Sequence, residues 1–421
     1  MKRLLVVLGL LTVVSLVITA CGAATPAPAP AVQPAAPAAQ PAAAEPAQAP
    51  EPTKAPEPVV AASRGTISLW HGWTGTEANT LADLVAKFGE TGVKVDLLAV
   101  PFDQLKNKFT TEASTGGGPD LLIGPKDWIG ELAQADLIQP LDDLADKVGL
   151  GNLNKSAVDA NRFGGKVWAF PESTEAVGLW YNKDLVTETP KSWEELLTQA
   201  STVGLGLNIG FYHSAGLLLG GGGSIFGENQ VCSLDKSESV TNALQFLLDA
   251  KNTPNVIADA DGGKLDAAFK DGKIGFVFNG PWATGDYAAA LGADKIGIVE
   301  PISLPGGAFA PFLGTKNFFL SANSTSDLAL EFLKFMSEAD TQAMMAAIGH
   351  IPSNPNVEVD DPIIAGFLKQ TGTASYFPNE PEMGAVWTPG ADMITKVVEG
   401  KMTPAEAVAE ACLTINTANK K

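Results

Sequence analysis

The alternation of short strands with amphipathic helices, which begins near residue 66, constrains the fold of this chain more than any other feature. β-Prone runs at 66–70, 93–100 and 120–123 alternate with helical segments at 76–90 and 102–114. A βαβαβ order of this kind is typical of a sheet with helices on both faces. We therefore predict an α/β fold with mixed, mostly parallel sheets.

Two later helices carry recognisable start signals. Ser192 is followed three residues later by Glu195, and Thr403 is followed by Pro404 and Glu406. A Ser or Thr that accepts a hydrogen bond from the third helical residue, with a Glu there, predicts a capping box.

Composition narrows the function classes. The 421 residues suggest two to three domains at roughly 150 residues each, and the net charge is −19, from 28 basic and 47 acidic residues. Nucleic acid is not an expected partner, because phosphate binding needs a basic face. Three Cys and three His offer little for a metal cluster, so we expect neither metal nor cofactor. A binding protein or a carboxylate enzyme remains.

The N-terminus predicts export and lipidation. Residues 1–20 have a basic start and an apolar run, as in a signal peptide. The run ends in Ala20-Cys21, which resembles the lipobox of bacterial lipoproteins and implies that Cys21 becomes the lipid-bearing first residue. The alternative is an uncleaved single-pass anchor. Either reading places the chain at the extracytoplasmic face of the cell membrane, with the lipid bilayer as a partner through Cys21.

Residues 21–64 form the next predicted segment, a spacer rich in Ala and Pro. Proline fixes φ and removes a hydrogen-bond donor, so we predict an extended, partly polyproline linker.

Most catalytic motifs are weak or missing. The glycines at 220–223 lack the Lys-Ser/Thr of a phosphate-binding loop, so we expect them to allow close backbone approach. The run 259–262 has the wrong spacing for a calcium loop. The three His have no partner at ligand spacing and are expected to be structural or exposed. Cys232 and Cys412 could form a disulfide.

Tryptophan gives the strongest signal, with eight Trp against four Tyr. Several follow predicted strands, where ligands bind in open α/β sheets. Aromatic faces there can stack on sugar rings, and nearby Asp127 and Glu175 can accept hydrogen bonds from hydroxyls. For any one Trp, core packing is the competing interpretation, and we assign Trp168, Trp180 and Trp193 to the core.

From about residue 65 onward the chain resembles the extracytoplasmic solute-binding proteins of ABC importers, in particular the maltose and maltodextrin receptors. The motifs that carry the resemblance are Gly118-Pro119-Asp120, Tyr181-Asn182-Lys183-Asp184-Leu185, Asn279-Gly280-Pro281-Trp282 and Pro378-Asn379-x-Pro381-x-Met383-x-x-Val386-Trp387.

The resemblance implies a periplasmic-binding-protein-like (type II) fold, with two lobes joined by a hinge and a ligand cleft between them. Lobe 1 would comprise residues 65–173 and 317–363, and lobe 2 residues 174–316 and 364–421. The implied ligand-binding residues are the aromatic platforms Trp282 and Trp387, the aromatic contact Tyr212, the lobe-1 carboxylate Asp127, and Glu175 near the hinge. For Glu175, a hinge salt bridge is the alternative.

The sequence departs from the maltose receptors at several of their contact positions. Trp128 stands in place of an Arg, and Thr284, Gly124 and Ala391 replace other contact residues. The loop from Trp73 to Glu77 replaces an Asp-Lys pair. We therefore expect a differently shaped sugar pocket, in which Glu77 also binds ligand and Trp73 and Trp128 supply lobe-1 platforms.

These features together predict a lipid-anchored sugar receptor of an ABC importer, not an enzyme. It would bind a sugar or oligosaccharide, maltodextrin-like by preference, close about its hinge, and dock on ABC permease subunits. The first alternative is another solute, such as a polyol, a glycerol phosphodiester or a different oligosaccharide; a phosphorylated one would favour basic residues, for which Lys126 and Arg162 are the candidates. A carboxylate glycosidase using Asp127 and Glu175 and a structural adhesin are more remote.

Overall fold

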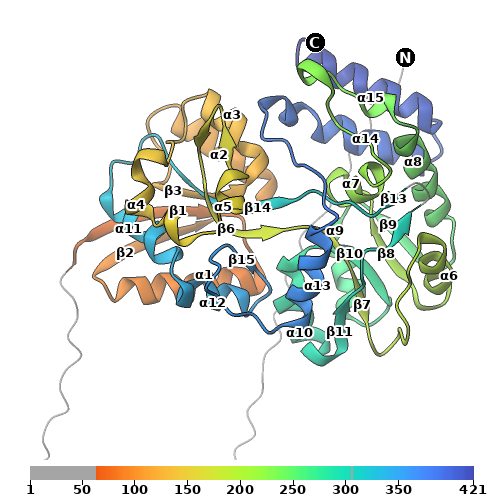
Figure 1. Cartoon of the computed structure of the whole chain (residues 1–421), viewed down its shortest axis with the longest axis horizontal. Helices are drawn as coiled ribbons and strands as arrows, with labels where there is room; N and C mark the ends of the chain where they lie inside the picture. Colours follow the sequence, from red (N-terminus) through yellow and green to blue (C-terminus); the bar gives the residue numbers. More distant parts are fainter. Residues whose placement is uncertain (1–62, 305–306) are drawn as a thin grey trace, which may run out of the picture. The chain divides into compact units, whose positions relative to one another are not determined.

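The computed structural model describes residues 63–304 and 307–421. The predicted signal peptide, Cys21 and nearly all of the predicted linker lie outside these residues. The described chain forms two lobes, each built on one sheet with helices on both faces (Figure 1).

The first lobe contains a six-stranded sheet of order β15-β6-β14-β3-β1-β2. Its strands are β1 (Gly65–His71), β2 (Val93–Ala99), β3 (Leu121–Pro125), β6 (Phe170–Glu175), β14 (Gly314–Leu320) and β15 (Ile351–Pro352). The intervening helices are α1 (Gly75–Gly89) and α2 (Phe102–Ala113). The predicted βαβαβ order is therefore confirmed, with boundaries shifted by one or two residues.

Strand alternation buries both faces of this sheet. On β14, Phe318 packs with α1, α11 (Asp327–Met336) and α12 (Ala339–Ala346). Its neighbour Phe319 points to the opposite face and packs with α2 and α3 (Ile129–Gln134). Figure 1 shows these two sets of helices on opposite sides of the strands. Burial on both faces explains why the second half of β14, Phe318 to Leu320, is a continuous apolar run.

The second lobe contains a five-stranded sheet of order β11-β7-β10-β8-β9. The strands are β7 (Gly178–Asn182), β8 (Leu205–Asn208), β9 (Val256–Asp259), β10 (Phe276–Asn279) and β11 (Ile296–Ile298). The helices that cover it are α6 (Trp193–Val203), α7 (Phe211–Leu219), α8 (Glu238–Lys251), α9 (Gly262–Lys270), α10 (Thr284–Leu291), α13 (Pro362–Thr371), α14 (Trp387–Val398) and α15 (Pro404–Ala418). The sheet separates a large core beneath α6, α7, α8, α14 and α15 from a smaller one beneath α9, α10 and α13.

Short elements complete the described chain. The brief helices and strands are α4 (Ala145–Val148), α5 (Lys155–Asp159), β4 (Arg162–Phe163), β5 (Lys166–Val167), β12 (Ser303–Leu304) and β13 (Gly307–Ala308). The 3-10 turns are η1 (Lys126–Trp128), η2 (Asp142–Leu144), η3 (Leu150–Asn152), η4 (Glu228–Gln230), η5 (Leu234–Lys236), η6 (Pro281–Ala283), η7 (Ala293–Lys295) and η8 (Pro381–Ala385).

Both sheets are mixed, as predicted, but the parallel share is smaller than expected. Only β1–β2, β1–β3, β10–β8 and β8–β9 are parallel pairs. The remaining five pairs are antiparallel. The difference arises because strands from distant parts of the chain, such as β14, are inserted beside sequentially local ones, and a local pattern does not indicate their direction.

The predicted helix starts are present with one difference. Thr403 and Glu406 form a reciprocal capping box on α15. At α6, the Ser192 hydroxyl accepts from the Glu195 N–H at 3.2 Å, but the Glu195 carboxylate accepts from the Lys191 N–H instead of closing the box.

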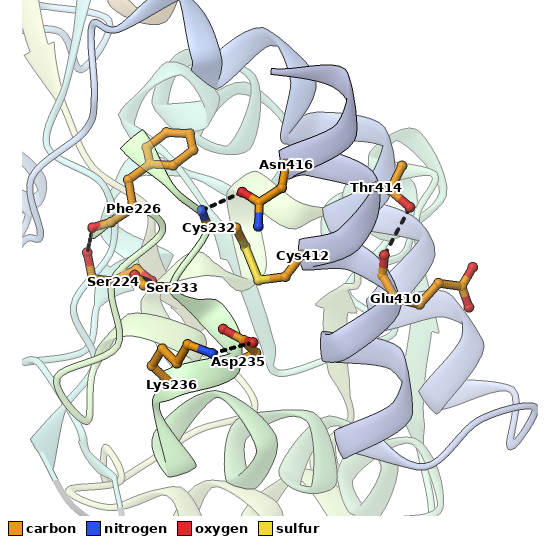
Figure 2. Close-up of a disulfide and its surroundings, with 10 residues drawn as sticks. All are labelled: Ser224, Phe226, Cys232, Ser233, Asp235, Lys236, Glu410, Cys412, Thr414 and Asn416. Carbon is orange, nitrogen blue, oxygen red and sulfur yellow. Dashed lines mark hydrogen bonds and ion pairs between the residues drawn. A yellow bond between two sulfur atoms is a disulfide. The ribbon is translucent and has the colours of Figure 1, made fainter. Parts of the chain in front are cut away.

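Cys232 and Cys412 form a disulfide, one of the outcomes that the sequence left open, with Cα atoms 5.3 Å apart (Figure 2). The bond joins the loop after α7 to α15 across 180 residues of sequence. The expectation for the glycine run is also confirmed at Gly220, where an added Cβ would lie 2.3 Å from the Ala308 carbonyl oxygen.

Candidate functional site

Two of the predicted site residues, Asp127 and Trp387, are in direct contact. Asp127 lies in η1, directly after β3, and Trp387 is the first residue of α14. The indole Nε1–H of Trp387 donates to Asp127 Oδ2 at 3.1 Å. Burial raises the pKa of Asp127 to about 6, because desolvation outweighs the nearby Lys106 charge and the hydrogen bonds that it accepts. The Asp127 carboxylate is therefore a buried hydrogen-bond acceptor that is contacted by a residue of the other lobe.

Three predicted aromatic residues form one cluster. Tyr212, in the first turn of α7, lies 6.3 Å from Trp282 and 6.4 Å from Trp387, measured between ring centroids. Trp282 is placed there by η6, which begins at Pro281 immediately after β10. Phe312 and Phe377 pack behind Tyr212 at 6.0 and 5.9 Å. Such a cluster offers apolar faces on which the CH surface of a sugar ring can stack.

Glu175 borders the same cluster. It is the last residue of β6. The Tyr212 hydroxyl donates to Glu175 Oε1 at 3.2 Å, whereas Glu175 Oε2 is buried without a hydrogen-bond partner among the described residues. Burial raises the pKa of Glu175 above its ordinary value. Because a buried acceptor normally has a partner, Oε2 is available for a ligand hydroxyl.

A second polar group, which the sequence analysis did not find, surrounds Lys316. Its ammonium forms a buried ion pair with Glu77 and lies 5.5 Å from the Trp73 ring and 5.6 Å from the Trp282 ring. Lys316 thus stands between an indole of each lobe, at a distance where a cation is attracted to the ring faces. The sequence signal that could have identified Lys316 is that it is the single charged residue in strand β14, all of which is buried.

His350 continues this group. Its Nε2 lies 2.8 Å from Glu77 Oε1, and its Nδ1 lies 2.8 Å from Glu172 Oε2. Although burial disfavours the imidazolium, the two carboxylates raise the pKa of His350 above its ordinary value. The expectation of a structural His is met here in a specific form, because both ring nitrogens face a carboxylate.

Glu77 is held ionised by the same contacts. Burial acts to raise its pKa, but the Lys316 charge and the His350 hydrogen bond together lower it to about 2. Glu77 is therefore ionised at neutral pH.

Trp128 lies apart from the cluster. Its ring stacks between Phe102, at 5.7 Å, and Phe319, at 6.5 Å, and its side chain fills the space beside Gly124. Both faces are covered and the residue is 5% exposed, so this structure places Trp128 as a packing residue of the first lobe. Its role as a sugar platform stays a prediction that requires Phe102 to move away.

Trp73 occupies an intermediate position. It is 9% exposed and packs edge-on against Phe318 and His350, at 6.5 and 5.4 Å. Through Lys316 it borders the aromatic cluster of the other lobe. The structure therefore brings together Trp73, Glu77, Asp127, Glu175, Tyr212, Trp282 and Trp387 around one region, and leaves Trp128 behind it.

Other residues behave as follows. Trp180 and Trp193 are core residues, as expected. Trp168, which the sequence also assigned to the core, is instead partly exposed at the edge of the core, where its Nε1–H donates to the Phe163 carbonyl at 2.9 Å. Asp261, which the sequence placed in a weak calcium-like run, caps α9 by accepting from the Gly263 N–H at 3.0 Å.

Within residues 63–304 and 307–421, His, Cys, Asp and Glu side chains form no group of three or more suited to a metal ion. Among these same residues, no helix is both long and apolar enough to span a bilayer.

Known proteins that are similar to this chain include two oligosaccharide-binding proteins. The chain is 27% identical over 343 residues to the maltotriose-binding protein of Pyrococcus abyssi, covering 77% of this chain and 75% of the relative. It is 27% identical over 366 residues to the galactooligosaccharide-binding protein of Bacillus subtilis, covering 80% and 86%.

Two solved structures of sugar-binding proteins are similar to this chain in both sequence and fold. The maltotriose-binding protein of Thermus thermophilus, solved with maltotriose, is 32% identical with a TM-score of 0.77, covering 84% of this chain and 100% of that one. The GacH receptor of Streptomyces glaucescens, solved unliganded and with acarbose, is 27% identical with a TM-score of 0.78, covering 85% and 99%. The sequence profile described as "Bacterial extracellular solute-binding protein" matches residues 72–343. The chain therefore belongs to the family of bacterial extracellular solute-binding proteins.

Proposed function

We propose that this protein is the extracytoplasmic receptor of an ABC importer and binds an oligosaccharide, maltodextrin-like by preference, between its two lobes. The observation that carries the proposal is the Trp387–Asp127 hydrogen bond, which brings an aromatic residue of one lobe against a buried carboxylate of the other. Family membership and the relatives that bind maltotriose support the same assignment.

The chemistry of the cluster favours a neutral sugar. Tyr212, Trp282 and Trp387 provide ring faces, and Asp127 and Glu175 provide acceptors for hydroxyl donors. Hydrogen bonds from hydroxyls to buried carboxylates are charge-assisted and stronger than neutral ones. A phosphorylated solute is disfavoured, because the basic groups near the cluster already have partners. Lys316 is paired with Glu77, Arg162 is exposed and paired with Asp142 and Asp159, and Lys126 faces Tyr376 and Phe377.

Hinge closure is the proposed delivery step. Contacts already join the lobes, such as Thr76 with Asp286 and the Asn379 amide with the Ala160 carbonyl at 2.8 Å. A sugar that touches both lobes has a higher affinity for the closed form than for the open one, and that difference is what can shift the equilibrium.

We place the lobe boundaries close to those expected from the sequence. The pairing of Gly314 with Glu175 in the first sheet moves the two crossings to about 175/176 and 313/314. The third crossing stays near 363, after which α13 packs on β11 of the second sheet. Short crossings of this kind suit a hinge, since few residues must change φ and ψ.

The remaining parts of the proposal concern the membrane. Cys21 would carry lipid, and residues 22–62 would serve as the linker between the lipid and the lobes. Permease subunits in the membrane would be the docking partner. The streptococcal relative described as a maltooligosaccharide solute-binding lipoprotein supports this arrangement.

The proposed receptor is not an enzyme. A retaining or inverting glycosidase needs one ionised and one protonated carboxyl group at the scissile bond. Here burial raises the pKa of both Asp127 and Glu175, so burial acts on the two carboxyl groups in the same direction and not in opposite ones.

The test is intrinsic Trp fluorescence titrated with gluco- and galacto-oligosaccharides. A saturable change with maltotriose is expected, with affinity reduced at least thirtyfold in Trp282→Ala and Trp387→Ala. Trp168→Phe is the matched control, because Trp168 lies outside the cluster. Equal loss in the control would show that the signal reports general folding, and full affinity in both cluster variants would refute the site.

A further inference from the structure

Four side chains of the first lobe form a row of alternating charges that ends at the aromatic cluster of the second lobe. Glu172 Oε2 lies 2.8 Å from His350 Nδ1, and His350 Nε2 lies 2.8 Å from Glu77 Oε1. Glu77 in turn pairs with Lys316, whose ammonium lies 5.6 Å from the Trp282 ring. The inner end of this charge row is buried, since the Glu172 and His350 side chains are each 1% exposed.

The geometry fixes the protonation of the His350 ring. A neutral imidazole donates from one nitrogen only, yet each ring nitrogen lies at hydrogen-bond distance from a carboxylate oxygen. Both contacts are hydrogen bonds when the ring carries two protons. Burial disfavours that charged ring, but Glu172 and Glu77 outweigh it and raise the pKa of His350 above its ordinary value.

We propose that His350 is a positioning residue of the sugar site, whose doubly protonated ring holds Glu77 and Lys316 in place against Trp282. The ring acts through Lys316 and touches no sugar itself. The inference rests on the proposed function, since it assumes that a sugar binds beside Trp282. It adds a regulated property, a loss of sugar affinity at alkaline pH, when the ring gives up one proton.

The loss of that proton rearranges the charge row. Glu172 is more deeply buried than Glu77, at 1% against 13% exposed, and an unpaired carboxylate costs more where it is more buried. The ring therefore keeps the proton on Nδ1 and loses the one on Nε2. The free Nε2 lone pair repels the Glu77 carboxylate and can accept from the Lys316 ammonium, which lies 3.2 Å away. Lys316 is thereby drawn toward the ring and away from its place over Trp282.

The charged groups that face the His350 ring come from three elements: Glu172 and Glu175 on β6, Glu77 on α1, and Lys316 on β14. Farther out, His71 lies near Glu77, and burial lowers the pKa of His71, so that this ring is already neutral at alkaline pH. Burial also lowers the pKa of Lys126, to about 8. Because Lys126 titrates in the same range, the titration of the His350 ring itself is the measurement that isolates its effect.

The experiment follows the His350 ring by NMR between pH 5 and 10, in the purified protein with and without saturating maltotriose. The chain has three His, so the His350 signal is identified by its absence in His350→Gln. Because coupling between two sites is reciprocal, a sugar site that prefers the protonated ring must raise the His350 pKa when sugar binds. Calorimetry at pH 7 and 9.5 should show the matching loss of maltotriose affinity, of about fivefold or more.

Glu172→Gln is the diagnostic variant. It keeps the size of the side chain and an acceptor for the Nδ1–H, but removes the charge. The His350 pKa should therefore fall, and the alkaline loss of maltotriose affinity should move to lower pH with it. Glu331→Gln, exposed on α11 and paired with Arg64, is the matched control and should change neither value.

Two results would overturn the positioning role while leaving the proposed function intact. One is a His350 pKa that saturating maltotriose does not change. The other is a Glu172→Gln variant in which the His350 pKa falls but maltotriose affinity keeps the pH dependence of the wild type. Absence of sugar binding at every pH is distinguishable from both, because the His350 ring still titrates, and it would refute the proposed function together with the positioning role.

Discussion

Asp286 of one lobe caps a helix of the other. Its Oδ1 accepts from the Thr76 N–H at 3.1 Å and from the Thr76 hydroxyl at 2.7 Å, in the first turn of α1. The N-cap residue of α1, Thr74, provides no side-chain hydrogen bond of its own. Asp286 thus gives the Thr76 N–H a side-chain partner from the other lobe, and a carboxylate there also meets the positive end of the helix dipole.

This relationship predicts that Asp286→Ala weakens the closed form. A lost cap costs about 0.5–2 kcal/mol, so the dissociation constant for the sugar should rise roughly two- to thirtyfold. Calorimetry measures the change, and small-angle scattering should show a more open average form at subsaturating sugar. Asp294→Ala, exposed in the same lobe, is the control. Unchanged affinity in Asp286→Ala would show that the contact plays no part in closure.

Gly75 supplies a second test of the same contact. Its φ is +54°, and an added Cβ would lie 2.7 Å from Asp286 Oδ2. Gly75→Ala should therefore reduce sugar affinity by at least as much as Asp286→Ala, and combining the two changes should add little. Fully additive losses in the double variant would argue that the two residues act separately.

Sugar affinity should depend on the ionisation of Asp127. Its pKa is raised to about 6, and a ligand hydroxyl bonds better to the carboxylate than to the acid. Affinity should therefore fall as the pH drops through about 6, by up to tenfold per unit. Because a raised carboxyl pKa means that folding favours the protonated form, this loss does not reflect unfolding through Asp127. Calorimetry between pH 7.5 and 5 should show the step in the wild type and a smaller one in Asp127→Asn, where Glu175 still titrates. An undiminished step in Asp127→Asn would contradict the assignment.

Stability should depend on Glu77 over a lower pH window. Its pKa falls from an ordinary value of 4.5 to about 2 in the folded chain. The stabilisation is therefore fully present above about pH 4.5 and is lost as the pH falls toward 2, amounting to about 3 kcal/mol. Glu77→Gln should lower the urea midpoint at pH 7 and much less at pH 3. A pH-independent difference would contradict this assignment. Glu131→Gln, whose carboxylate pairs with Lys106 nearer the surface, is the control.

The disulfide should stabilise the second lobe. It closes a loop of 180 residues, and loss of a native disulfide typically costs about 2–5 kcal/mol. The double variant Cys232→Ser, Cys412→Ser should therefore unfold at lower temperature, and a reducing agent should lower the wild-type transition to the same value. A transition temperature equal to that of the oxidised wild type would show that the bond contributes nothing.

Local pattern explains which elements could be predicted. The strand and helix over 65–89 carry their own periodicity and turn residues, so their type followed from the sequence. The direction of β14 did not, because it depends on pairing with β3 and β6, which come much earlier in the chain, as in the pairing of Lys316 with Pro125. Thr403 could be identified as a cap, since that contact spans three residues.

The same contrast between local sequence patterns and long-range contacts applies to the residues of the site. Trp282 and Trp387 follow recognisable motifs, and the structure brings them beside Tyr212. Trp128 has the same local signal, a Trp after a strand, yet tertiary neighbours cover both of its faces. Lys316 has no motif at all, because its meaning comes only from Glu77 and two indoles contributed by other segments. Residue type and spacing could predict the aromatics, whereas the buried charges needed the assembled fold.

Calorimetric titration of the purified protein with maltotriose is the most direct test of sugar binding between the lobes. We expect saturable binding at one site, with a micromolar or lower dissociation constant, which Trp387→Ala weakens at least thirtyfold. No heat and no fluorescence change with maltotriose, longer maltodextrins or galactooligosaccharides would contradict it.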